Sequence, residues 1–220
     1  MIIDKQINKS QSKLLLFFAG WSASPESFRH LEATEDTDLW ICYDYRDLTF
    51  DEDLSTYREI RLVAWSLGVW VASVVFRDKE WPFTDAIAIN GTTCPIDDRL
   101  GIPQALFKGT MENLTAEGMH RFNRRMCGKK EILQAYEQTP ARPLAEIREE
   151  LQYLYQQITD GSVIPGAPII WTNAFISSDD RIFPAENLRT FWQGRCPITE
   201  IEAPHYLFNL WKQWNDLWIQ

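Results

Sequence analysis

A serine, a pair of aspartates and a histidine occur in this chain in an order that suits nucleophilic catalysis. Ser66 stands in the pentapeptide A-W-S-L-G, Asp179 and Asp180 follow far downstream, and His205 comes last. A serine hydroxyl becomes a good nucleophile when a histidine removes its proton, and a carboxylate then fixes the tautomer of that histidine. We therefore predict acyl transfer on Ser66.

The segments around Ser66 predict how the serine is presented. Residues 60–64 form an apolar, β-branched run typical of a buried strand, and residues 67–76 have the apolar spacing of a helix. A serine between them lies in a strained turn at a helix N-terminus, which favours developing negative charge. Strand and helix approach closely there, and the small residues Ala64 and Gly68 allow it. The same pentapeptide also fits an ordinary strand-to-helix turn.

The choice of histidine follows from position along the chain. His30 precedes the serine, and His120 lies beside arginines in a helical region, whereas His205 follows the expected last strand. In serine hydrolases of the α/β type the acid and then the histidine follow the nucleophile. We therefore predict that His205 is the general base, the alternative being a structural histidine.

The acid has two candidates. Residues 180–184 read D-R-I-F-P, a D-x-[IV]-x-P form found where α/β hydrolases carry their acid. We prefer Asp180 to Asp179, although either aspartate could simply stabilise a turn.

A tetrahedral oxyanion needs two backbone N–H donors. We expect them from Leu67, directly after the serine, and from Trp21, in the turn after the strand at residues 14–18; Trp21 could instead be only a core aromatic residue.

The remaining pattern predicts the elements that carry these residues. Apolar runs at residues 14–18, 40–43, 86–90, 169–171 and 198–201 predict strands of a mainly parallel sheet, with ligands at the carboxyl ends of the strands. Residues 1–6 are expected to pair with the 14–18 strand as an edge. A short helix should begin at Pro25, residues 44–57 should be mostly loop, and residues 206–219 should form an aromatic-rich closing helix.

Helical stripes replace strand patterns between residues 94 and 165, where prolines separate the segments. We therefore divide the chain into an α/β core at residues 1–93 and 166–220 and a helical insertion at residues 94–165. Within the insertion, residues 120–130 (H-R-F-N-R-R-M-C-G-K-K) contain five arginine and lysine side chains and no acid. On a helix Arg121, Arg124 and Arg125 share one face and Phe122 and Met126 the other. This is either a docking face for an acidic macromolecule above an apolar pocket or an ordinary solvated face.

Composition limits the other possibilities. The chain has 220 residues, 45% hydrophobic residues and a formal net charge of −9, which excludes a disordered chain and argues against general nucleic-acid binding. The four cysteines are scattered, so no disulfide framework or metal site is predicted. No signal peptide or membrane-spanning run is recognised, and we expect a cytoplasmic protein without membrane contact.

The motifs together resemble those of the BioG-type pimeloyl-[acyl-carrier-protein] methyl ester esterases of biotin synthesis. The segments that carry the resemblance span nearly the whole chain, and the most specific is R-F-N-R-R-M-C-G at residues 121–128; the others are F-F-A-G-W-S at 17–22, A-W-S-L-G at 64–68, I-N-G-T at 89–92, G-I-P at 101–103, F-K-G-T at 107–110 and A-P-H at 203–205.

The resemblance implies an α/β-hydrolase fold with a helical lid inserted between strands, and hydrolysis of the pimeloyl methyl ester on acyl carrier protein without a cofactor or metal. It implies a monomer in which Arg121, Arg124 and Arg125 meet the acidic carrier protein. The roles that it implies for the remaining residues are nucleophile for Ser66, general base for His205, orienting acid for Asp180, oxyanion site for Trp21 and Leu67, and acyl pocket for Trp21, Trp65, Phe122 and Met126. Alternative functions are a general short-chain carboxylesterase or thioesterase and a non-catalytic carrier-binding module.

Overall fold

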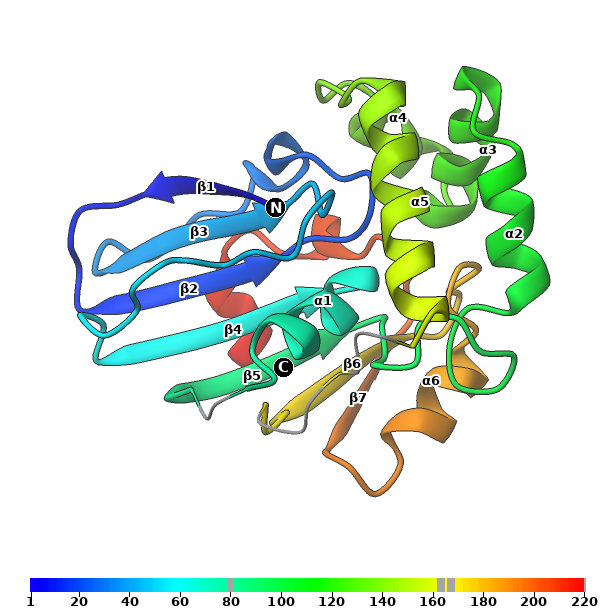
Figure 1. Ribbon diagram of the computed structural model, residues 1–220. Coiled ribbons are helices and arrows are strands. Elements are labelled where there is room, and N and C mark those ends of the chain that lie inside the picture. Colours follow the sequence, from blue (N-terminus) through cyan, green and yellow to red (C-terminus); the bar gives the residue numbers. More distant parts are fainter. Residues whose placement is uncertain (79–80, 162–164, 166–168, 220) are drawn as a thin grey trace.

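A seven-stranded sheet forms the centre of the computed structural model, which describes residues 1–78, 81–161, 165 and 169–219 (Figure 1). The strand order is β1-β3-β2-β4-β5-β6-β7, and all pairs are parallel except β1 with β3. The carboxyl ends of six strands therefore lie at one edge. The strands are β1 Ile2–Ile7, β2 Lys13–Phe18, β3 Thr37–Tyr43, β4 Glu59–Trp65, β5 Phe83–Ile89, β6 Asn173–Ser177 and β7 Ile198–Ile201.

The central strands form because their apolar runs can be buried on both faces. Leu16, Phe17 and Phe18 of β2 are fully buried, as are Leu62 and Val63 of β4. Continuous apolar runs of this kind are characteristic of parallel strands covered on both sides. The mainly parallel α/β sheet predicted from the sequence is thereby confirmed.

Two strand predictions were wrong in detail. The N-terminal strand β1 pairs antiparallel with β3, not with β2, because both edges of β2 are already occupied by β3 and β4. The sixth strand begins at Asn173 instead of running over residues 169–171. Ile170 is 82% exposed, so that apolar run is not a strand core, whereas Ala174 to Ile176 are buried.

Layers on both faces of the sheet cover the strands. Helix α1 (Leu67–Val75) lies on one face, and the 3-10 turns η1 (Pro25–Phe28), η2 (Phe208–Leu210) and η3 (Trp214–Trp218) lie on the other (Figure 1). Helix α6 (Ala185–Trp192) lies near β6 and β7. Residues 44–57 contain no helix, as expected.

The predicted closing helix over residues 206–219 was wrong. The segment contains two 3-10 turns because its aromatic side chains pack into the sheet. The rings of Phe208 and Trp214 contact Phe17 of β2, with centroids 5.5 and 4.8 Å from the Phe17 centroid. The backbone N–H of Trp214 donates to the Glu32 carbonyl. These contacts with the sheet and with the irregular loop at Glu32 take the place of the continuous backbone hydrogen bonds of an α-helix.

In the described part of the chain between β5 and β6, four helices form a cap over the carboxyl edge of the sheet, which we call the lid (Figure 1). They are α2 Gln104–Glu112, α3 Ala116–Cys127, α4 Lys130–Glu137 and α5 Leu144–Thr159. Their positions agree with the predicted helical insertion. The expected boundary near residue 165 adjoins residues 162–164 and 166–168, which lie outside the described part of the chain.

Candidate active site

Ser66 occupies a strained turn between β4 and α1. Its backbone has φ 59° and ψ −128°, a region that residues other than glycine seldom adopt, and its side chain is buried below the lid. The turn requires a close approach of α1 to β2, since a Cβ atom on Gly68 would lie 2.4 Å from the Phe18 carbonyl oxygen. This geometry is the strand-turn-helix that the pentapeptide predicted, with Oγ at the carboxyl edge of the sheet.

A hydrogen-bonded chain joins Ser66, His205 and Asp180. Nε2 of His205 lies 3.0 Å from Ser66 Oγ, and Nδ1 lies 2.6 Å from Asp180 Oδ2. The other carboxylate oxygen of Asp180 accepts from the N–H groups of Ile182 and Phe183 at 2.7 and 2.9 Å. These bonds fix the carboxylate and leave one oxygen for the histidine. With its proton on Nδ1, His205 can accept the Ser66 proton.

The neighbouring aspartate is oriented differently. Asp179 is exposed, and its backbone N–H donates to the Ala203 carbonyl. Of the two sequence candidates for the acid, only Asp180 contacts His205 in the described structure.

Two buried side chains hold the histidine loop, a role that sequence reasoning assigned to neither of them. The carbonyl of His205 accepts from Asn90 Nδ2 at 2.9 Å and from Trp65 Nε1 at 3.1 Å. Asn90 also bonds Ser177 through its Nδ2 and Oδ1 atoms, and its φ is 46°. Because Ser177 ends β6 just before the Asp180 loop, Asn90 links the acid loop to the histidine loop. In the sequence, the only signal for this role was a polar residue followed by a glycine, Asn90-Gly91, directly after a buried apolar run.

The expected oxyanion donors belong to the two turns that flank Ser66. Leu67 is the first residue of α1. Its backbone N–H therefore has no hydrogen-bond acceptor within the helix. Trp21 follows β2, and its indole Nε1 donates to the Ile147 carbonyl of α5 at 2.9 Å. The next residue, Ser22, has φ 67°, so this turn is also strained.

An apolar pocket adjoins the Ser66–His205 pair and has a free volume of about 30 Å³. It contains the four side chains expected from the sequence, Trp21, Trp65, Phe122 and Met126. The pocket residues missed by sequence reasoning are Ile102, Leu106, Phe107, Thr110, Arg125, Leu151 and Ile182.

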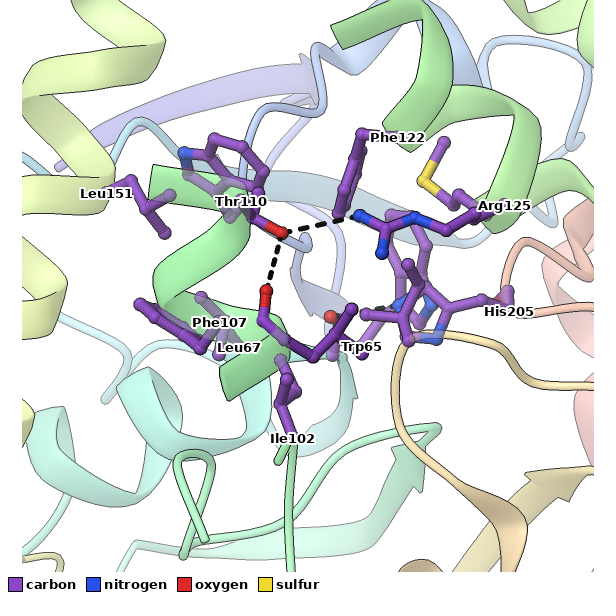
Figure 2. Close-up of a pocket in the computed structure, with 14 residues that line it drawn as sticks. Trp65, Leu67, Ile102, Phe107, Thr110, Phe122, Arg125, Leu151 and His205 are labelled. Atoms are coloured by element: carbon purple, nitrogen blue, oxygen red, sulfur yellow. Dashed lines mark hydrogen bonds between the residues drawn. The ribbon is translucent and has the colours of Figure 1, made fainter. Parts of the chain in front are cut away.

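Arg125 reaches this pocket, as Figure 2 shows, although the helical pattern assigned it to the docking face. Its Nη2 atom lies 3.4 Å from Thr110 Oγ1, and its guanidinium carbon lies 5.9 Å from the Phe122 ring centroid. Partial burial lowers the pKa of its guanidinium. Arg121 and Arg124 are exposed, and Arg121 is paired with Glu117 at 2.6 Å.

A groove of about 390 Å³ between α2 and α3 borders all three arginines. It shares Leu106, Thr110, Phe122 and Arg125 with the Ser66 pocket. The groove and the pocket therefore lie on either side of the same four side chains.

The other two histidines lie outside this arrangement. His30 Nε2 is 3.0 Å from the Phe208 carbonyl, and His120 Nδ1 is 2.9 Å from Glu137 Oε1. Within the described ranges, no group of three histidine, cysteine or acidic side chains could hold a metal ion, and no helix is long and apolar enough to cross a bilayer.

The fold places the chain in the α/β-hydrolase class. A lipase-esterase related protein from Clostridium acetobutylicum superposes with a TM-score of 0.64 at 15% sequence identity, covering 95% of this chain and 93% of that one. At this identity the likeness concerns the fold alone, and it agrees with the predicted α/β-hydrolase architecture.

The chain belongs to the family described as pimeloyl-ACP methyl esterase BioG, whose model matches residues 2–217. The crystal structure of BioG from Haemophilus influenzae superposes with a TM-score of 0.93 at 45% identity, covering 99% of this chain and all of that chain. A malonyl-[acyl-carrier protein] O-methyltransferase from Bacteroides fragilis is 44% identical over 199 residues, which are 89% of this chain but only 40% of that protein.

Proposed function

We propose that this protein hydrolyses the methyl ester of pimeloyl-[acyl-carrier protein] to pimeloyl-[acyl-carrier protein] and methanol in biotin synthesis. The observation that carries the proposal is the buried Ser66–His205–Asp180 chain beside an apolar pocket, which shares four wall residues with the arginine-lined groove. Membership of the BioG family supports the reaction class. The partial match to a methyltransferase named for a carrier-bound acid supports a carrier-bound methyl ester as substrate.

In the proposed mechanism, Ser66 Oγ attacks the methyl ester carbonyl while His205 Nε2 takes the serine proton. Asp180 keeps the imidazole in the required tautomer and stabilises its positive charge. The N–H groups of Leu67 and Trp21 stabilise the oxyanion of the tetrahedral intermediate. When the intermediate collapses, the carbon–oxygen bond to the methoxy group breaks and His205 protonates the departing methanol.

The acyl chain is then attached to Ser66 through an ester bond. A water molecule attacks this ester, His205 accepts a water proton, and the second tetrahedral intermediate releases Ser66 Oγ, which regains a proton from His205. Because the pimeloyl group is still joined to the carrier at its other end, the intermediate links Ser66 covalently to the acyl carrier protein.

We further propose that residues 94–165 act as the lid domain of this enzyme and that its arginines dock the carrier. Arg121 and Arg124 are exposed on α3, and carrier proteins of this class are acidic, so the contact should weaken with salt. Arg125 lies nearer Ser66, where it can accompany the acyl chain or its linker into the pocket.

The test is to compare pimeloyl-carrier-protein methyl ester with p-nitrophenyl acetate as substrates of the purified protein. Methanol release from the carrier-bound ester at a much higher kcat/KM supports the proposal. Cleavage of p-nitrophenyl acetate alone would favour a general short-chain esterase. A fluorophosphonate probe covers the remaining alternative, because failure to label the wild-type protein would favour a non-catalytic carrier-binding module.

A further inference from the structure

Glu150 is a carboxylate of the lid that is completely buried and lies outside the Ser66 pocket. One oxygen, Oε1, accepts from the backbone N–H of Tyr45 at 2.9 Å, and the other, Oε2, accepts from the backbone N–H of Ser22 at 3.4 Å. Tyr45 follows β3 and Ser22 follows β2. A single side chain of α5 therefore joins two loops at the carboxyl edge of the sheet.

The charge of Glu150 is balanced within a buried cluster. Arg142 Nη1 lies 2.7 Å from Glu150 Oε2, and Arg142 Nη2 lies 2.8 Å from Asp44 Oδ1. Asp44 is also held by Arg46 through two bonds of 2.8 Å. Burial raises the pKa of Glu150, while the Arg142 charge and the Tyr45 N–H oppose that increase.

The same helix holds the turn after β2 at a second point. The Trp21 indole N–H donates to the carbonyl of Ile147, three residues before Glu150 on the same face of α5. The Tyr45 hydroxyl lies 2.8 Å from the Ala19 carbonyl, immediately before this turn. The turn that contains the second expected oxyanion donor, Trp21, is thus held by Ile147 of the same helix and by Tyr45, whose backbone N–H donates to Glu150.

A buried ion-pair cluster is a poor source of net stability, because desolvation of the charges offsets much of their attraction. Its geometry is nevertheless specific, since each oxygen of Glu150 has a different backbone donor. Ser22 has a positive φ, a conformation that a residue other than glycine keeps only when its surroundings impose it. Such a turn needs an external partner to keep a backbone N–H aimed at a reacting carbonyl oxygen.

We propose that Glu150 is a positioning residue for the oxyanion site. From its place in the lid, Glu150 holds the turn of residues 20–23 so that the backbone N–H of Trp21 points at the substrate carbonyl oxygen. This inference rests on the proposed function. It makes the lid part of the catalytic geometry: α5 aligns the oxyanion turn, while α3 contacts the acyl chain.

The experiment compares Glu150→Gln with Glu149→Gln in the full-length protein. Glu149 is the preceding residue of α5, and its carboxylate is 61% exposed and paired only with Arg46 among the described contacts. Steady-state hydrolysis of p-nitrophenyl acetate gives kcat and KM, and a trifluoromethyl ketone, which forms a tetrahedral oxyanion with the serine, gives an inhibition constant. Losing one oxyanion donor typically lowers kcat by about 10²–10³-fold. Partial misalignment of the Trp21 backbone N–H should therefore lower kcat by roughly 10-fold to 100-fold.

The expected result for Glu150→Gln is a fall in kcat and a matching loss of trifluoromethyl ketone affinity, with KM nearly unchanged and Glu149→Gln equal to wild type. A lower melting temperature with wild-type kcat and inhibitor affinity at 25 °C would overturn the proposal and leave a purely structural role. Arg142→Lys, which keeps the charge but cannot bridge Glu150 and Asp44, is the second variant if Glu150→Gln does not fold. It should show a smaller loss of the same kind, and wild-type values would again overturn the proposal. Absence of esterase activity in the wild type would instead refute the proposed function.

Discussion

The two halves of the candidate active site are built differently. The core half consists of Ser66, Asp180 and His205, each of which follows a strand of the sheet and is fixed by backbone hydrogen bonds or buried side chains. The lid half consists of side chains of helices, such as Phe122 and Arg125, that meet the core across the apolar pocket. Under the proposed function, the core half carries out the chemistry, whereas the lid half selects the acyl group and, through Glu150, positions the oxyanion turn.

The largest effect is expected for the acid of the core half. Asp180→Asn should lower kcat by roughly 10³–10⁴-fold, since the amide favours the wrong histidine tautomer. Asp179→Asn is the matched control. This substitution should leave kcat unchanged, because Asp179 is exposed. Steady-state kinetics on p-nitrophenyl acetate measure both. Equal losses in the two variants would remove the distinction between these neighbours.

A second prediction concerns the support of the histidine loop. Asn90→Ala removes one hydrogen bond to the His205 carbonyl and two to Ser177, leaving buried partners unsatisfied. We expect kcat to fall by about 10-fold, with a free energy of unfolding lowered by roughly 1–3 kcal/mol. Chemical denaturation and kinetics should be measured together. An unchanged kcat in the folded variant would show that Trp65 alone suffices to hold the loop.

The exposed arginines of the lid half should respond through KM and only for the carrier-bound substrate. Arg124→Glu should raise KM for pimeloyl-carrier-protein methyl ester by about 5-fold or more, which corresponds to roughly 1 kcal/mol for one exposed charge contact. Hydrolysis of p-nitrophenyl acetate should be unaffected. Arg77→Glu, at an exposed arginine just after α1, is the control.

Arg125→Glu, by contrast, should impair hydrolysis of both substrates, because Arg125 lines the Ser66 pocket.

The smallest effect is expected for the shape of the pocket. Phe122 packs edge-on against Trp21, with ring centroids 5.0 Å apart. Phe122→Leu removes three carbon atoms from the pocket wall and should change the ratio of kcat/KM between longer and shorter p-nitrophenyl esters by about 3-fold to 10-fold. This is at or below the lower end of the roughly 10-fold to 200-fold effect of one methylene on the substrate itself. An unchanged ratio would mean that Phe122 does not contact the acyl chain.

The sequence predicted the core half well because local patterns determine it. An apolar run, a tight turn with small neighbours and a helix bring Ser66 to the sheet edge, and parallel strands bring the loops with Asp180 and His205 to the same edge. The position of β6 was predicted too early because residues 169–171 are as apolar as a strand, although Ile170 is exposed. Burial of a short run depends on its neighbours in space.

The contacts between lid and core could not be predicted in the same way. Helical spacing correctly put Phe122 and Met126 on the buried face of α3, yet it could not show that Arg125 bends toward Thr110 on another helix. Glu150 stands on the apolar stripe of α5, between Ile147 and Leu151, so an acidic residue at a buried position was visible in the sequence. Its partners, Tyr45 and Ser22, are more than a hundred residues away in the chain. Only the folded arrangement identifies them.

The measurement that most sharply tests the proposed mechanism is methanol release from pimeloyl-carrier-protein methyl ester by wild type and by Ser66→Ala. The mechanism predicts multiple turnovers by the wild type and a loss of roughly 10³-fold or more in the variant. Acid quenching during the wild-type reaction should also trap carrier protein joined covalently to Ser66. Equal methanol release by both proteins, or none by a wild type that still cleaves p-nitrophenyl acetate, would contradict the proposed reaction.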